Sequence, residues 1–145
     1  MSSLLALHDT LAYKFFAIKK NMIAASRQYF QEVGISFDMY IVLRVIYEAP
    51  GSKQREISEI CDKDANVIVK TIDRLERMGF VQRVRDETDR RAYTLYVTEA
   101  GTKVAEDFSE LFVERQEACL GDLTEEEKKE LRRLLDKILA NQKNN

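Results

Sequence analysis

The hydrophobic pattern of this chain changes its period once, near residue 80, and that change limits the folds open to it. Between residues 37 and 79, apolar residues recur at steps of three and four, as they do on the buried side of a helix. From Phe80 to Thr98 the pattern becomes two short alternating runs, FVQRVR and YTLYVT, separated by the polar segment DETDRRA. Alternating runs of this length are typical of strands. The middle of the chain therefore predicts helices followed by a two-stranded β-hairpin.

Two helices are predicted first in this segment. Ser36 is suited to cap the helix FDMYIVLRVIYE, which is apolar almost all round and which Pro50-Gly51 ends. Ser52 is expected to cap the short helix KQREISEIC, in which Ile57, Ile60 and Cys61 face inward.

A tight turn and a third helix follow. Asp64 can cap this helix, Gly79 ends it, and its expected buried stripe is Ile68, Ile72 and Leu75. The order helix, short helix, tight turn, helix and hairpin is that of a winged helix-turn-helix, in which the helix after the turn can enter the major groove of DNA.

The two ends of the chain also read as helical. The first thirty residues carry an apolar stripe broader than a small domain can cover, which indicates contact with a partner chain, and Gly34 is suited to end the helix. Near the other end, one helix breaks at Gly121-Asp122. Thr124 and Glu127 then form a capping box that opens the last helix.

Composition argues against several classes of protein. Apolar residues make up 45% and charged residues 33% of the chain, which fits a folded domain. No run approaches the roughly 18 uncharged apolar residues of a membrane span, and no secretory signal is visible, so the protein is expected in the cytoplasm. His8 is the only histidine, and no glycine-rich phosphate loop occurs. We therefore expect no catalytic site, no metal and no cofactor.

The two cysteines, Cys61 and Cys119, lie in no metal-ligand or redox spacing, and two buried free thiols are expected. A thiol switch at Cys61 stays open, because that role depends on exposure and a lowered pKa.

The polar side of the third helix predicts a contact surface for the major groove. Amide, basic and methyl groups there match adenine, guanine and thymine respectively. The start of the preceding helix suits phosphate contacts, and the hairpin tip suits the backbone or a minor groove. The candidate residues are Asn66, Val67, Lys70, Thr71, Arg74 and Arg77 on the third helix, Lys53, Gln54 and Arg55 on the preceding one, and Arg90 and Arg91 at the tip.

Each of these features alone has an ordinary explanation. A basic helix side is commonly a solvated surface, and a polar hairpin tip is commonly a plain turn. The net charge is −2, and the segment from Lys53 to Arg91 carries ten basic against nine acidic residues. The positions of the charges, rather than their sum, must therefore create any DNA-binding surface.

The run from Ile35 to Lys103 resembles the MarR family of bacterial transcriptional regulators. The likeness rests on the LERMGFV junction between helix and hairpin, on the D-x-x-D-R-R pattern from Asp86 to Arg91, and on the TEAG ending from Thr98 to Gly101. It implies a fold that is mainly α with a small β-hairpin. Residues 1–33 would form an N-terminal dimerisation helix, 35–98 the winged helix-turn-helix lobe, and 99–145 the C-terminal dimerisation helices.

The resemblance also implies roles for single residues. Arg90 would reach the minor groove beside the helix that enters the major groove, and Arg74 would contact DNA or form an ion pair with Asp86 of the wing. The family usually has arginine where Thr88 stands, and often a basic residue at Ala65. Both differences remove positive charge, so weaker nonspecific binding or a different base preference is expected.

Many members of this family release DNA when a small phenolic or carboxylate effector binds between the dimer helices and the DNA-binding lobe. By resemblance, Tyr13, Phe16, Tyr40 and Tyr47 would line such a cleft, although each also suits an ordinary core. Some relatives sense oxidants through a cysteine near the start of the chain. No cysteine precedes Cys61 here, which does not support that type of sensor.

Together these features predict a homodimeric transcriptional regulator that binds a pseudo-palindromic operator in double-stranded DNA. Repression by occlusion of a promoter is the expected mode, with activation as the alternative. The competing prediction is a protein-interaction module, because winged helices also serve as scaffolds that never touch DNA.

Overall fold

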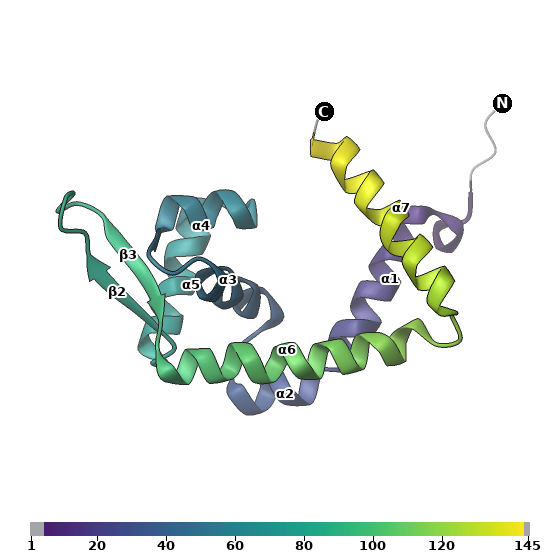
Figure 1. The fold of residues 1–145 in the computed structure, drawn as a ribbon, viewed down its shortest axis with the longest axis horizontal. Helices are drawn as coiled ribbons and strands as arrows, with labels where there is room; N and C mark the ends of the chain where they lie inside the picture. The colour runs from purple at the N-terminus through teal and green to yellow at the C-terminus, as the bar shows by residue number, and fades with distance from the viewer. Residues whose placement is uncertain (1–4, 144–145) are drawn as a thin grey trace.

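A computed structural model describes residues 5–143 of the chain. Its elements, in chain order, are η1 (Leu7–Asp9), α1 (Leu11–Ala24), α2 (Arg27–Val33), α3 (Phe37–Glu48), β1 (Ser52–Lys53), α4 (Gln54–Cys61), α5 (Ala65–Arg77), β2 (Val81–Arg85), β3 (Tyr93–Val97), α6 (Glu99–Leu120) and α7 (Glu125–Lys143). In Figure 1, α3, α4, α5 and the hairpin β2–β3 lie at one end, and α1 and α7 lie at the other. The long helix α6 joins the two ends.

The sheet has one strand more than the predicted hairpin. The strands pair in the antiparallel order β1-β3-β2, and the short β1 aligns Ser52 with Leu95. Ser52 therefore has extended backbone and does not cap α4, so the predicted cap was wrong. Its hydroxyl donates to the carbonyl of Ala49 at 2.6 Å, and Lys53 is the N-cap residue.

The core of the winged helix-turn-helix lobe follows the helical spacing of the sequence. The predicted stripe of α5, Ile68, Ile72 and Leu75, is fully buried together with Ile57 of α4. Removing large aliphatic side chains of this kind from water stabilises the fold by about 1.5–3 kcal/mol each. Ile60 is an exception, because 60% of it is exposed although an inward position was expected.

The predicted N-terminal helix is broken. α1 ends at Ala24, the N–H of Ser26 donates to the carbonyl of Ile23, and α2 begins at Arg27. The change of direction brings α2 onto the core, where the Phe30 ring lies 4.5 Å from that of Phe108. Gly34 ends α2 at φ +85°, as the sequence predicts.

Helix α6 is fixed to α2 and α3 along its first half. The Tyr29 hydroxyl donates to the carbonyl of Val104 at 3.1 Å, and the Tyr40 hydroxyl donates to that of Ala105 at 3.3 Å. The Tyr40 and Phe108 rings meet edge to face at 4.2 Å. These contacts set the angle between α6 and the lobe that carries the hairpin.

The helices at the far end leave apolar side chains uncovered. No described residue of α1 or α7 is buried. The large exposed side chains on these two helices are Leu11, Tyr13, Phe15, Phe16, Ile18, Leu134, Ile138 and Leu139. Within residues 5–143, the chain by itself offers nothing that covers them.

Candidate nucleic-acid interface

The outer side of α5 is the centre of the candidate interface. The Asp64 carboxylate accepts a hydrogen bond from the N–H of Asn66 at 2.7 Å and caps the helix, as predicted. Because the buried stripe takes up one side, the polar residues face outward. Asn66, Val67, Lys70, Arg74 and Arg77 are exposed, and Thr71 is half-buried with its hydroxyl bonded to the carbonyl of Val67.

The three candidate residues at the start of α4 make different contacts. Lys53 is paired with Asp86 of the wing, with 3.4 Å between Nζ and Oδ2. Gln54 accepts a hydrogen bond from Arg83 through its side-chain carbonyl. Arg55 is the most exposed of the three, with only a loose contact of 3.9 Å to Glu59.

The loop at the tip of the wing is held by two aspartates. Asp86 Oδ1 accepts hydrogen bonds from the backbone N–H and the hydroxyl of Thr88, both at 3.0 Å. These bonds, together with Lys53, lower the pKa of Asp86. Asp89 accepts from the N–H of Arg91 at 3.0 Å. Thr88, which stands where the resembling family usually has arginine, thus helps to build the turn.

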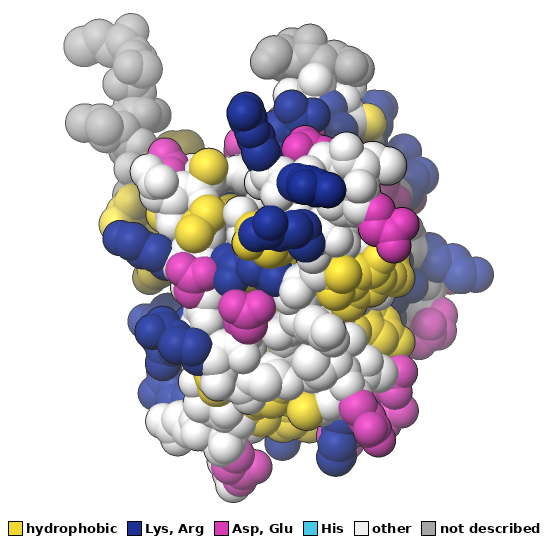
Figure 2. All heavy atoms as spheres, turned by 90° about the vertical axis from the view of Figure 1, so that its left-hand side faces the viewer, with side chains coloured by type: hydrophobic (Ala, Val, Ile, Leu, Met, Phe, Trp, Pro, Cys, Tyr) yellow, Lys and Arg dark blue, Asp and Glu magenta, His cyan; other side chains and the backbone are white. Residues whose placement is uncertain are grey.

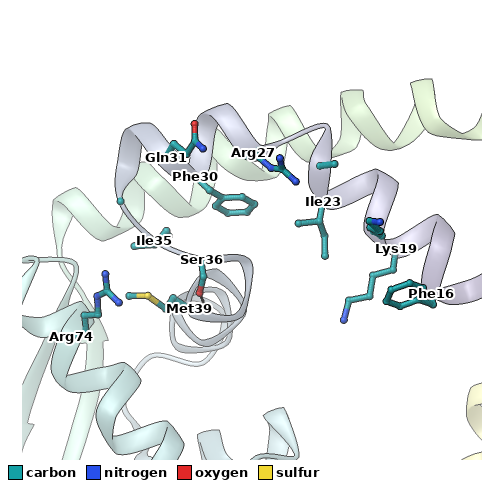
Figure 3. Close-up of a pocket in the computed structure, with 13 residues that line it drawn as sticks. Phe16, Lys19, Ile23, Arg27, Phe30, Gln31, Ile35, Ser36, Met39 and Arg74 are labelled. Atoms are coloured by element: carbon teal, nitrogen blue, oxygen red, sulfur yellow. Dashed lines mark hydrogen bonds between the residues drawn. The ribbon is translucent and has the colours of Figure 1, made fainter.

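The ion pair implied for the wing has a different partner. The resemblance suggested Arg74 for Asp86, but the structure pairs Asp86 with Lys53. Arg74 instead lies near Met39 of α3, and both line one cleft (Figure 3).

A cleft of about 450 Å³ lies between the start of α4 and the wing. Its lining residues are Lys53, Gln54, Arg55, Asp89, Arg91, Ala92 and Tyr93. Figure 2 views the end of the molecule that carries the wing, and Lys and Arg side chains gather in the upper part of that face. Arg90 is exposed at the tip but does not line this cleft.

Arg83 was not predicted as part of the site. It lies on β2 at 14% side-chain exposure, and its guanidinium contacts Asp73 at 2.6 Å and Glu76 at 3.0 Å, both on α5. Its Nε donates to Gln54 of α4 at 3.0 Å. The alternation of the strand could have revealed it, because Arg83 lies two residues from the buried Val81 and so shares its inward face.

A second, larger cleft of about 660 Å³ lies between α1, α2 and the lobe. Phe16 and Ile23 of α1 face Phe30 of α2 and Met39 of α3, and Arg74 reaches it from α5 (Figure 3). Four basic side chains, Lys19, Lys20, Arg27 and Arg74, and no acidic ones are among its lining residues.

The four residues predicted to line an effector cleft do not all lie at this second cleft. Only Phe16 lines it. Tyr13 lies next to Phe16, with 6.1 Å between ring centres. Tyr40 is buried against α6, and the Tyr47 hydroxyl donates to Glu106 at 2.9 Å, so both lie outside the cleft.

The cysteines differ from the expected pair of buried thiols. Cys119 is exposed and Cys61 is partly buried. Burial raises the pKa of the Cys61 thiol, which lowers its thiolate fraction and counts against a redox switch there.

Membrane spans and metal sites were also sought among residues 5–143. No helix there is long and apolar enough to cross a membrane, and no group of three or more His, Cys, Asp or Glu is placed to hold a metal ion.

Comparisons with known proteins converge on one class. Residues 25–108 match the family model described as transcriptional regulator SarA/Rot. The HTH-type transcriptional regulator BilQ of Clostridium symbiosum is 31% identical over 132 residues, covering 91% of this chain and 92% of that protein. A MarR protein from Peptoclostridium difficile superposes with a TM-score of 0.86 at 25% identity, over 99% of this chain and 95% of that one.

The fold also matches that of a protein solved with DNA. Streptococcus pneumoniae FabT in complex with DNA has a TM-score of 0.78 at 21% identity, over 92% of this chain and 96% of that one. At this identity the match concerns the fold alone.

Proposed function

We propose that this chain, which belongs to the MarR-type SarA/Rot family of DNA-binding transcriptional regulators, binds its operator as a homodimer through α5 and the wing. The family and the relatives found are regulators and not enzymes. The observation that carries the proposal is the outer side of α5, where Lys70, Arg74 and Arg77 are exposed and take part in none of the ion pairs within residues 5–143. Unpaired basic groups on a groove-facing helix are available to bases and phosphates.

The wing and the start of α4 extend this surface. Arg55, Arg90 and Arg91 are exposed near the cleft between the two elements. In the proposed complex, Arg55 and Arg91 bind phosphates on either side of the cleft, and Arg90 enters a minor groove.

The uncovered apolar sides of α1 and α7 support the homodimer. Side chains such as Phe15, Ile18 and Leu139 are exposed in one chain, and a second copy would remove them from water. A two-fold axis would place the two α5 helices about 34–36 Å apart, one turn of DNA. The operator is therefore a pseudo-palindrome, and its occupation represses by covering a promoter.

A gel-shift titration tests the surface directly. Lys70→Ala should weaken binding to an operator fragment about tenfold, since it removes a groove contact. Lys103→Ala on α6, an exposed residue paired with Asp107, is the matched control and should bind like the wild type. Equal affinity of all three proteins would remove α5 from the interface.

Salt dependence separates DNA binding from the scaffold alternative. Binding through phosphates releases counterions, so the affinity for duplex DNA should fall steeply with salt. Binding to a protein partner that salt does not weaken, without binding to duplex DNA at low salt, would favour the scaffold.

The larger cleft supports regulation by a small effector. Its apolar wall includes Phe16 and Phe30, and its basic groups suit a molecule with an aromatic or aliphatic body and a carboxylate. Arg74 connects the cleft to α5, so an anion bound there would alter the DNA-binding side. Salicylate, as a simple probe of this class, should raise the melting temperature of the wild type and should do so less for Arg27→Ala. An equal shift in both proteins would place any binding elsewhere.

A further inference from the structure

Helix α5 also carries two carboxylates, Asp73 and Glu76. An ion pair with either carboxylate would make a basic side chain of α5 less available to DNA. Asp73 lies three residues after Lys70 and four before Arg77, the spacings at which helical side chains meet. Glu76 lies on the same helix, and both carboxylates are partly exposed, at 48% and 42%. An unpaired Asp73 would either pair with these basic groups or repel the phosphates of DNA.

Both carboxylates are bound by a single residue of another element, Arg83 of β2. Arg83 of β2 contacts Asp73 Oδ1 with one terminal nitrogen and Glu76 Oε1 with the other. The backbone N–H of Arg83 also donates to Glu76 Oε2 at 3.3 Å. Its remaining nitrogen, Nε, donates to Gln54, so every nitrogen of the guanidinium has a partner.

The same contacts join the three elements that would meet DNA. Arg83 belongs to the wing, Asp73 and Glu76 belong to α5, and Gln54 stands at the start of α4. At 14% exposure the guanidinium is mostly shielded from water, where charge-assisted hydrogen bonds are stronger than on an open surface.

We propose that Arg83 is a positioning residue for DNA binding. By holding Asp73 and Glu76, it leaves Lys70 and Arg77 free for DNA. Arg83 itself needs no contact with DNA for this role. The inference rests on the proposed α5 interface.

The test compares variants for binding to a labelled duplex of mixed sequence, over a range of salt concentrations. Arg83→Gln should bind about tenfold more weakly, and its affinity should fall less steeply with salt, because Asp73 then occupies basic groups that otherwise release counterions. Adding Asp73→Asn and Glu76→Gln to Arg83→Gln should restore the affinity to within about threefold of the wild type. With Arg83 intact, the same two carboxylate substitutions should raise the affinity much less, because Arg83 already holds both carboxylates. An equal rise in both backgrounds would be an effect of net charge alone and would overturn the inference.

Two controls keep the test decisive. Arg85→Gln removes the same charge from the same strand without touching either carboxylate, and should weaken binding much less than Arg83→Gln. If Arg83→Gln does not fold, the pair Asp73→Asn and Glu76→Gln with Arg83 intact still applies. That variant should bind at least as tightly as the wild type.

Each outcome has a distinct meaning. A folded Arg83→Gln protein that binds like the wild type overturns the inference, as does a folded triple variant that stays weak. A wild-type protein that binds no duplex at low salt overturns the proposed function instead.

Discussion

The basic residues of the lobe divide into those that hold the structure and those that face solvent. Lys53 and Arg83 bind carboxylates of neighbouring elements. Lys70, Arg77 and Arg90 are exposed and take part in none of the ion pairs described for residues 5–143. Only the second group has charge to offer to DNA, although a count of Lys and Arg treats both groups alike.

The sequence predicted the second group better than the first. A helix with Ile68, Ile72 and Leu75 buried must expose its opposite side, so the residues facing outward on α5 follow from spacing alone. Which carboxylate Lys53 or Arg83 contacts depends on how separate elements approach one another. Periodicity carries no information on that approach, and the pairing of Asp86 with Lys53 was therefore missed.

The exposed tip of the wing leads to a prediction for Arg90. Because Arg90 is exposed at the tip, Arg90→Ala should weaken binding to all duplexes alike, and the slope of log affinity against log salt should fall by about one. The measurement is fluorescence anisotropy at several salt concentrations, with Lys103→Ala as the control. An unchanged affinity and slope would exclude the wing tip from the interface.

Tyr29 makes stability depend on alkaline pH. Burial, with a smaller effect from Asp107, raises the pKa of its phenol from 10.0 to about 12. The raised pKa means that Tyr29 contributes stability fully below pH 10, and that this contribution is lost as the pH rises towards 12. Tyr29→Phe also removes the hydrogen bond to Val104, at a cost of about 1 kcal/mol at neutral pH.

Urea denaturation across this range measures both effects. The wild type should lose more stability than Tyr29→Phe as the pH rises from 10 to 12. Parallel curves for the two proteins would show that the phenol is not protected in the fold.

At the scale of elements, the wing and α6 approach each other closely at Gly101. A Cβ atom on Gly101 would lie 2.0 Å from the backbone oxygen of Phe80. Thr98, which caps α6 as the sequence predicts, also donates its N–H to that oxygen at 3.0 Å. The end of β3, the start of α6 and the end of α5 are therefore held in one fixed arrangement.

Replacing this glycine should destabilise the lobe. Gly101→Ala forces backbone apart and should cost about 3 kcal/mol in the free energy of unfolding. Ala100→Ser, at the exposed neighbouring position, should cost less than about 0.5 kcal/mol. Thermal or urea unfolding measures both, and equal stability of the two variants would contradict the close approach.

The boundaries of the elements show where local signals are sufficient. Asp64, Thr98 and the Thr124–Glu127 capping box start their helices as predicted, because each cap is made within three residues. Ser52 was wrongly predicted to cap α4, and the break after α1 was not predicted. In both cases a distant partner decides the backbone, since Ser52 pairs with Leu95 of β3 and α2 turns to reach Phe108.

At the scale of the whole molecule, the exposed apolar helices lead to a prediction about assembly. The wild type should sediment at twice the 16.9 kDa mass of the chain. Leu134→Lys with Leu139→Lys places two charges in the exposed stripe of α7 and should shift the protein towards the monomer. Ala140→Lys, on the opposite side of the helix by its spacing, should leave the mass unchanged.

The selection of bound duplexes from random DNA tests the central claim most directly. If two α5 helices face adjacent major grooves across a two-fold axis, the enriched sequences should contain an inverted repeat. Its half-site centres should lie about 10–10.5 base pairs apart. The same selection with Lys70→Ala should lose this enrichment. No enriched sequence, or a single unpaired half-site that is also selected by Lys70→Ala, would contradict the account.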